Sequence, residues 1–154
     1  MNRDGRLSGV LHVLLHMAEH DAPVTSEALA RMMRTNPVVI RRVMAGLRDR
    51  GFVRSEKGHG GGWMLARELA AITLRDVYDA IGSPGLFAIG HRSEAPECAV
   101  EQAVNAALDD SLRDAEALLL TSFQRITLAA LSADFQHRLV QCQPRPSQGH
   151  KHAG

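Results

Sequence analysis

The sequence has few cysteines, few aromatic residues and no long apolar run, and each shortage excludes a class of protein. Its only cysteines, Cys98 and Cys142, form no CxxC pair, so neither a disulfide framework nor a zinc ribbon is expected. Aromatic residues make up 4% of the chain, which is a poor basis for stacking RNA bases. No apolar run approaches the roughly 18 residues of a membrane span. We therefore expect a cytoplasmic protein with reduced thiols and no membrane partner.

The chain also lacks the short motifs of common enzyme classes. It contains no nucleophile elbow, P-loop or dinucleotide-binding fingerprint. The run Gly60-Gly61-Gly62 lacks the GKS ending of a phosphate-binding loop and lies between two strand candidates. We expect neither catalysis nor a bound cofactor.

Charge is divided unevenly along the chain, although the formal net charge is only +1. Residues 1–67 carry 11 Lys and Arg against 6 Asp and Glu, a balance of +5. Residues 68–154 carry 7 against 11, a balance of −4. A basic first part can meet an anion while an acidic second part faces something else. Chance scatter of charges gives similar asymmetries, so this pattern only supports a nucleic-acid partner.

Apolar spacing and capping residues predict three helices in the first 50 residues. Apolar residues at three- and four-residue steps predict a helix over 7–20, with its histidines on the opposite face. A short helix over 27–33 follows, capped by Thr25 or Ser26. Asn36 as N-cap and Pro37 at the first helical position predict a third helix that ends before Gly51.

A hairpin and further helices complete the predicted fold. Strands are expected over 52–55 and 63–66, around a basic Gly-rich tip. Thr73 and Asp76 form a capping pair for a fourth helix. The order helix, helix, helix, hairpin is that of a winged helix-turn-helix. The expected fold class is therefore mostly α with a small β-hairpin, a winged helix-turn-helix plus a long C-terminal dimerisation helix.

The region from Cys98 to about Ile126 contains no Pro or Gly and carries an apolar stripe at helical spacing. A helix of about 25 residues spans roughly 37 Å, which is long for so small a domain. A second copy of the chain is the simplest partner for the stripe, and packing against its own domain is the alternative. We expect a DNA-binding domain over 1–82, a loop over 83–97, a dimerisation region over 98–132 and a disordered tail over 133–154.

The candidate DNA-binding residues lie at the exposed start of the third helix and at the hairpin tip. Arginine can contact guanine or phosphate in bidentate fashion, a helix start with free N–H groups suits a phosphate, and a valine can touch a thymine methyl. The candidates for contact with double-stranded DNA are Thr35, Asn36, Val38, Arg41, Arg42, Lys57 and His59. A solvated helix face is the alternative interpretation of the arginines.

Four segments resemble the Rrf2 family of bacterial winged-helix regulators. They are TNPVVIRRVM (35–44), LRDRGFV (47–53), KGHGGGWMLA (57–66) and ITLRDVYDAI (72–81), and the resemblance extends over about residues 5–131. It implies a homodimer joined through the long helix, binding to a palindromic DNA site and usually repression. Val38 stands where relatives often have a small polar residue, so base preference is expected to differ.

Some members of that family hold an iron–sulfur cluster through three closely spaced cysteines. This chain has only Cys98 in that region, with His91 as one conceivable extra ligand, so it resembles the branch without the cluster. Cys98 at a helix start is a candidate redox-sensing thiol or a plain packing residue. The histidines at 12, 16 and 20 are spaced for zinc or nickel, but a solvated face is the simpler interpretation and we expect no metal.

Two other functions remain open at this point. The chain can be a thiol-based redox or ligand sensor that switches through Cys98. It can also be a winged helix that binds proteins and no DNA.

Overall fold

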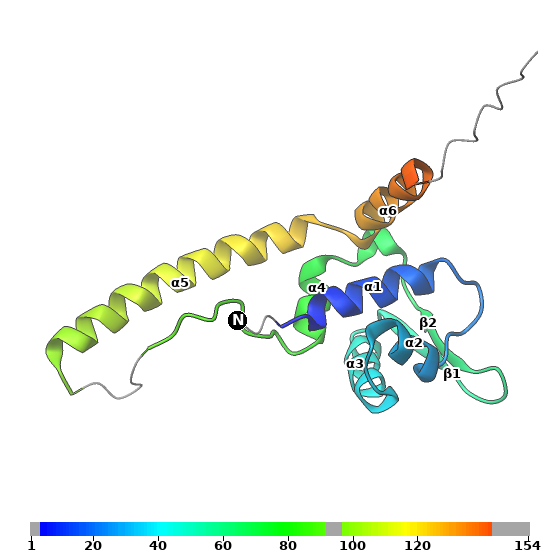
Figure 1. The fold of residues 1–154 in the computed structure, drawn as a ribbon, viewed down its shortest axis with the longest axis horizontal. Coiled ribbons are helices and arrows are strands. Elements are labelled where there is room, and N and C mark those ends of the chain that lie inside the picture. Colours follow the sequence, from blue (N-terminus) through cyan, green and yellow to red (C-terminus); the bar gives the residue numbers. More distant parts are fainter. Residues whose placement is uncertain (1–3, 92–96, 143–154) are drawn as a thin grey trace, which may run out of the picture.

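The computed structural model describes residues 4–91 and 97–142, in which helices predominate and two strands form a hairpin (Figure 1). The elements in chain order are α1 (Arg6–Ala18), α2 (Ser26–Met33), α3 (Pro37–Asp49), β1 (Val53–Glu56), β2 (Gly62–Leu65), the 3-10 turn η1 (Leu69–Ala71), α4 (Leu74–Ala80), α5 (Ala99–Arg125) and α6 (Leu128–Cys142). The expected mostly α fold with a small β-hairpin is confirmed.

The hydrophobic core lies in the N-terminal part of the chain, around α1. This helix contacts α2, α4, α6 and β2, and it buries Val10 and Leu14 as its apolar spacing predicts. Val13 and Met17 are buried as well, because neighbours cover α1 on several sides. Complete burial of one such side chain contributes about 1.5–3 kcal/mol. We call this unit, made of residues 5–81 together with α6, the winged-helix body.

The β-hairpin is attached to the body by a third backbone segment. Antiparallel pairing sets Val53 opposite Leu65, and Val24 forms an isolated bridge with Trp63 on the other side of β2. The Trp63 indole N–H donates to Ser26 Oγ at 3.0 Å, which satisfies the buried ring nitrogen. Gly62 permits this approach, since a Cβ there would lie 2.5 Å from the Val24 carbonyl oxygen. The hairpin therefore has a fixed base.

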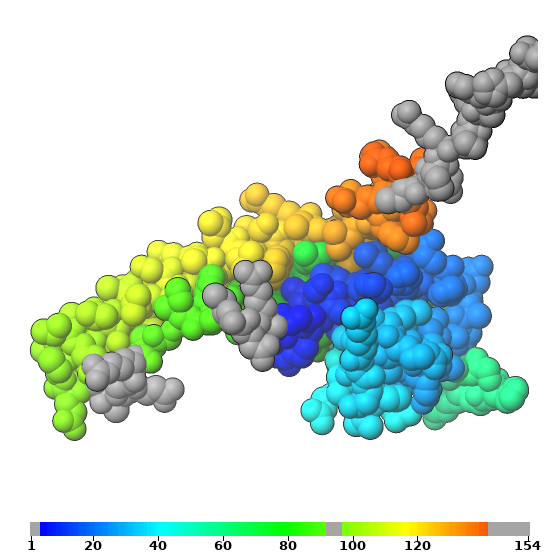
Figure 2. All heavy atoms as spheres, in the orientation of Figure 1, coloured from blue at the N-terminus to red at the C-terminus, as the bar shows by residue number. Residues whose placement is uncertain are grey.

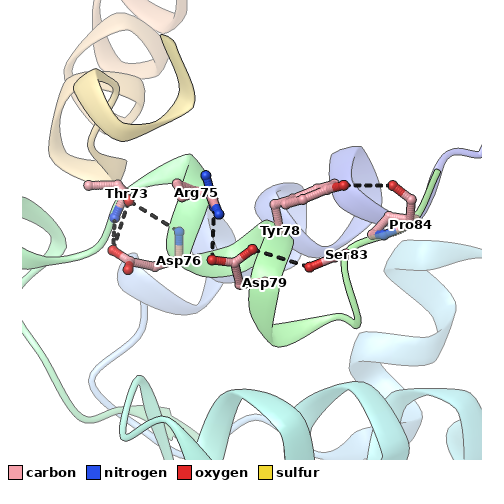
Figure 3. A network of polar contacts seen from close by, with 7 residues as sticks. All are labelled: Thr73, Arg75, Asp76, Tyr78, Asp79, Ser83 and Pro84. Carbon is pink, nitrogen blue, oxygen red and sulfur yellow. Dashed lines mark hydrogen bonds and ion pairs between the residues drawn. The ribbon is translucent and has the colours of Figure 1, made fainter. Parts of the chain in front are cut away.

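A polar network fixes α4 and the chain that leaves it (Figure 3). Thr73 caps the helix in a capping box with Asp76, as expected from the sequence. At the other end, the Tyr78 hydroxyl donates to the Pro84 carbonyl at 2.9 Å, and burial raises the pKa of Tyr78. The Tyr78 ring also meets Phe123 of α5 edge-on, with centroids 6.0 Å apart. Tyr78 thus joins the body, the following loop and α5.

The helix α5 forms an arm that extends away from the body (Figures 1 and 2). Its C-terminal end packs on α4, and the loop after α4 runs beside it, where His91 Nε2 lies 2.9 Å from Asp109 Oδ1. The apolar stripe is therefore partly covered by its own chain, as the alternative interpretation expected. Asn105 is the single buried residue of α5, whereas Val100, Val104 and Leu118 are exposed.

The segment 133–142 corrects the expectation of a disordered tail from residue 133. It belongs to α6, which packs on α1 and η1 and buries Leu128 completely. Gln136 Nε2 donates to both carboxylate oxygens of Glu19 at 2.9 Å. Phe135 meets the His16 ring edge-on, so the histidine face of α1 is not simply solvated. The rest of the expected tail lies outside the described residues.

Across the described part of the chain, no helix combines the length and apolarity needed to cross a membrane.

Candidate nucleic-acid interface

The pair α2 and α3 is held in a helix-turn-helix by its capping residues. Thr25 Oγ1 accepts from the Ala28 N–H at 3.2 Å and begins α2. Arg34 ends that helix in the left-handed region, with φ of 52°. Asn36 Oδ1 then accepts from the Val38 and Val39 N–H groups at 3.0 Å each. The turn between the helices is therefore short and defined at both ends.

One detail of the predicted helix start is wrong. The Thr35 N–H is not free for a phosphate, because it donates to the Ala30 carbonyl at 2.9 Å and closes the end of α2. The first N–H groups of α3 are likewise taken by the Asn36 side chain. The side chains of Thr35 and Asn36 can still meet a phosphate here.

The two faces of α3 differ as the spacing predicts. Ile40, Met44 and Leu47 are completely buried against the body. Val38 is 62% exposed on the opposite side, and Arg41 and Arg42 are exposed as well. Gly46 allows close packing on α4, since a Cβ would lie 2.5 Å from the Ala80 carbonyl oxygen. The body thus fixes α3 from behind and leaves its arginines accessible.

The two arginines have different surroundings. Arg41 Nη2 donates to Glu27 Oε1 of α2 at 3.0 Å, and both side chains are more than half exposed. Within the described residues no ion pair involves Arg42. Glu27 was not among the predicted residues, because it precedes Arg41 by 14 positions and no local spacing links them.

The hairpin carries the other predicted contacts. Lys57 and His59 are exposed in the turn between β1 and β2, where Gly58 and Gly60 adopt φ of 96° and 78°. Arg54 of β1 was not among the predicted residues. Its guanidinium donates to Glu56 at 3.0 Å and to the Leu65 carbonyl at 3.3 Å, so it is held along the hairpin. Strand alternation opposite the buried Val53 could have indicated its exposure.

Cys98 lies at the N-cap position of α5, away from the helix-turn-helix. The thiol is exposed, and the backbone N–H groups of Glu101 and Val100 at the start of α5 lower its pKa. A lowered pKa increases the thiolate fraction near neutral pH and with it the reactivity. The structure does not bring this residue together with the predicted DNA contacts.

Comparison with known proteins gives a consistent result. Residues 4–134 match the family described as Rrf2, iron-dependent transcriptional regulator. YwnA of Bacillus subtilis, named as an HTH-type transcriptional regulator, is 32% identical over 114 residues, which cover 73% of this chain and 84% of YwnA. YffB of Lactococcus lactis, similarly named, is 29% identical over 138 residues, 83% of each chain. A crystal structure of a Lactobacillus plantarum protein described as a transcriptional regulator has a TM-score of 0.71 and 28% identity, covering 89% of this chain and 95% of that one.

The word iron in the family description raises the question of a metal site, and neither the cysteine count nor the described residues fit one. A cluster bound by three thiolates needs three cysteines, and the whole chain has two. Nε2 of His91 already faces the Asp109 carboxylate. In residues 4–91 and 97–142, no three side chains of His, Cys, Asp or Glu are grouped so that they could hold a metal ion.

Proposed function

The chain belongs to the Rrf2 family of transcriptional regulators, and from this premise we propose that it is a homodimeric, sequence-specific DNA-binding repressor and not an enzyme. The observation that carries the proposal is the exposed start of α3, where Arg41 and Arg42 point away from a completely buried apolar face. This arrangement lets α3 enter a major groove while the body stays folded behind it.

Each predicted residue receives a role in this proposal. Arg41 and Arg42 contact guanine edges or phosphates, and Val38 contacts a thymine methyl. Thr35 and Asn36 contact phosphate through their side chains. Lys57 and His59, which are exposed at the hairpin tip, contact the adjacent DNA backbone.

The exposed apolar surface of the arm supports the proposed homodimer. Phe87, Leu118 and Leu119 line a groove of about 530 Å³ between α5 and the loop beside it. A second copy of α5 is the simplest partner for this surface, and a two-fold dimer reads a palindromic site. Repression then results when the dimer occupies a promoter and excludes polymerase.

The test is duplex binding by arginine variants. The probe is the tightest duplex that the wild-type protein recovers from a random-sequence pool. We expect Arg42→Ala to weaken binding by about tenfold or more, since a bidentate base contact contributes about 1–3 kcal/mol. Arg41→Ala weakens it less, because Arg41 must first leave Glu27. Arg113→Ala, an exposed arginine on α5, serves as the matched control. Unchanged affinity in both α3 variants refutes the assignment.

A thiol sensor is the second candidate function, favoured by the exposed, pKa-lowered Cys98 at the start of α5. The pKa of the Cys98 thiol is lower in the folded protein than in the unfolded chain. As pH is raised, the rate of Cys98 alkylation should therefore begin to increase at a lower pH in buffer than in urea. The variant Cys142→Ser removes the second cysteine, so that the measured alkylation is that of Cys98. If alkylated protein binds the selected duplex as the untreated protein does, this candidate is eliminated.

A further inference from the structure

Arg41 and Arg42 are neighbours on α3, and only one of them is paired with a carboxylate within the described residues. The Glu27 carboxylate of α2 accepts from Arg41 Nη2 at 3.0 Å, so the pair joins the two helices of the helix-turn-helix. The Arg48–Asp49 and Arg54–Glu56 pairs are local, between residues one and two positions apart. Of these three pairs, only the Arg41–Glu27 pair brings a negative charge from another element to α3.

This carboxylate competes with DNA for the same guanidinium. The pair is accessible, with side-chain exposures of 57% for Arg41 and 54% for Glu27, so a duplex can displace it. When Arg41 turns to DNA, Glu27 is left unpaired beside a row of phosphates, which is unfavourable. A guanine edge offers two hydrogen bonds in compensation, whereas a phosphate in a random sequence offers mainly charge.

We propose that Glu27 is an affinity-limiting residue, which holds Arg41 away from non-operator DNA and has to be displaced before Arg41 contacts a guanine at the operator. The inference rests on the proposed DNA-binding function. On random duplexes Arg41 stays with Glu27 and neutralises no phosphate. On the operator it exchanges the carboxylate for a base.

The experiment compares the wild type with Glu27→Gln on two probes across a salt series. One probe is the tightest duplex selected from a random pool, and the other is the same duplex scrambled. We expect the variant to bind the scrambled duplex about two- to fivefold more tightly, the size of one exposed ion pair. The plot of log affinity against log salt should steepen by about 0.9 for that duplex, because one more phosphate is neutralised. Operator affinity should rise more, because on the operator the wild type also has to break the ion pair and leave Glu27 unpaired, so the specificity ratio rises.

Two controls separate this effect from general charge and from folding. Asp49→Asn also removes one exposed carboxylate. Any gain in DNA affinity from long-range charge should therefore appear in this variant too, and it should leave the ratio of operator to scrambled affinity unchanged. Partial unfolding lowers the active fraction for both probes alike, and the ratio is therefore insensitive to it.

A double-mutant cycle completes the test. In an Arg41→Ala background Glu27→Gln should lose its effect on the ratio, whereas in an Arg42→Ala background the effect should persist. The proposal is overturned if Glu27→Gln leaves the ratio unchanged, lowers it, or acts equally without Arg41. If the wild type binds neither duplex with salt dependence, the proposed function itself has failed, which is a distinguishable result.

Discussion

The winged-helix body and the α5 arm are both built from helices with apolar stripes, but they use those stripes differently. In the body, α1 has four buried residues within 13, and neighbours cover it on several sides. The arm has one buried residue in the 27 of α5, and large apolar side chains such as Val100 and Leu118 are 71% and 75% exposed. The body is complete as one chain, whereas the arm presents a surface that a single chain does not cover.

The difference teaches that helical periodicity reports an apolar face and not what covers it. The stripe of α1 is covered by its own domain. The stripe of α5 is covered by α4 and the adjoining loop only in part, and the remainder is available to a second molecule. Stability should therefore reside in the body and assembly in the arm.

The largest effect should come from a core truncation in the body. Leu14→Ala removes a completely buried side chain, and the lost transfer free energy together with the cavity should cost about 2–5 kcal/mol of unfolding free energy. Leu118→Ala is the matched truncation on the arm. Urea denaturation, at a protein concentration too low for dimers to form, should show that Leu118→Ala changes the unfolding free energy by less than about 0.5 kcal/mol. Equal losses of unfolding free energy in the two variants would contradict the assignment of stability to the body and assembly to the arm.

Assembly should break when charge is placed on the arm. Leu118→Glu should raise the dimer dissociation constant by at least about tenfold, because burial of a leucine contributes about 1.5–3 kcal/mol and a two-fold interface contains the change twice. Sedimentation velocity over a concentration series measures it. Leu139→Glu on α6, also an exposed leucine, should leave assembly unchanged. If both variants dissociate alike, or neither does, the arm is not the interface.

A single added methyl group should distinguish the body from the loop beside the arm. Gly46→Ala inserts a Cβ that would lie 2.5 Å from the Ala80 carbonyl oxygen and should cost about 1–3 kcal/mol. Helix propensity alone predicts a gain of about 1 kcal/mol, so the sign of the change is informative. Gly85→Ala, where a Cβ meets nothing within 4 Å, is the control. Thermal unfolding of both variants gives the comparison, and a stabilised Gly46→Ala would rule out the close contact.

The smallest effect concerns the junction between the two regions. Tyr78→Phe keeps the ring contact with Phe123 and removes the hydrogen bond to Pro84, at a cost of about 0.5–1.5 kcal/mol. Amide exchange over 82–91 should accelerate while the core of the body stays protected. Because burial raises the pKa of Tyr78, its contribution is present at neutral pH and declines as pH rises through that pKa. The variant should lack this decline in alkaline denaturation, and an unchanged pH profile would argue against the role.

Much of the fold and part of the site could be predicted from local signals. Asn36 followed by Pro37 marked the start of α3, and Thr73 with Asp76 marked that of α4, since capping is decided within four residues. The exposure of Arg41 and Arg42 followed from helical spacing. The helix α6 was not predicted as a separate element, and its residues 133–142 were assigned to a disordered tail because of their polar composition. Packing on α1 overrides that composition.

The sequence by itself determined the order of elements, the caps and which face of each helix is apolar, because these depend on residues a few positions apart. Only the tertiary structure decided that Glu27 meets Arg41 and that α5 is partly covered by its own loop. Contacts of this kind join distant positions, and they exist only once the packed core has fixed the helices relative to one another.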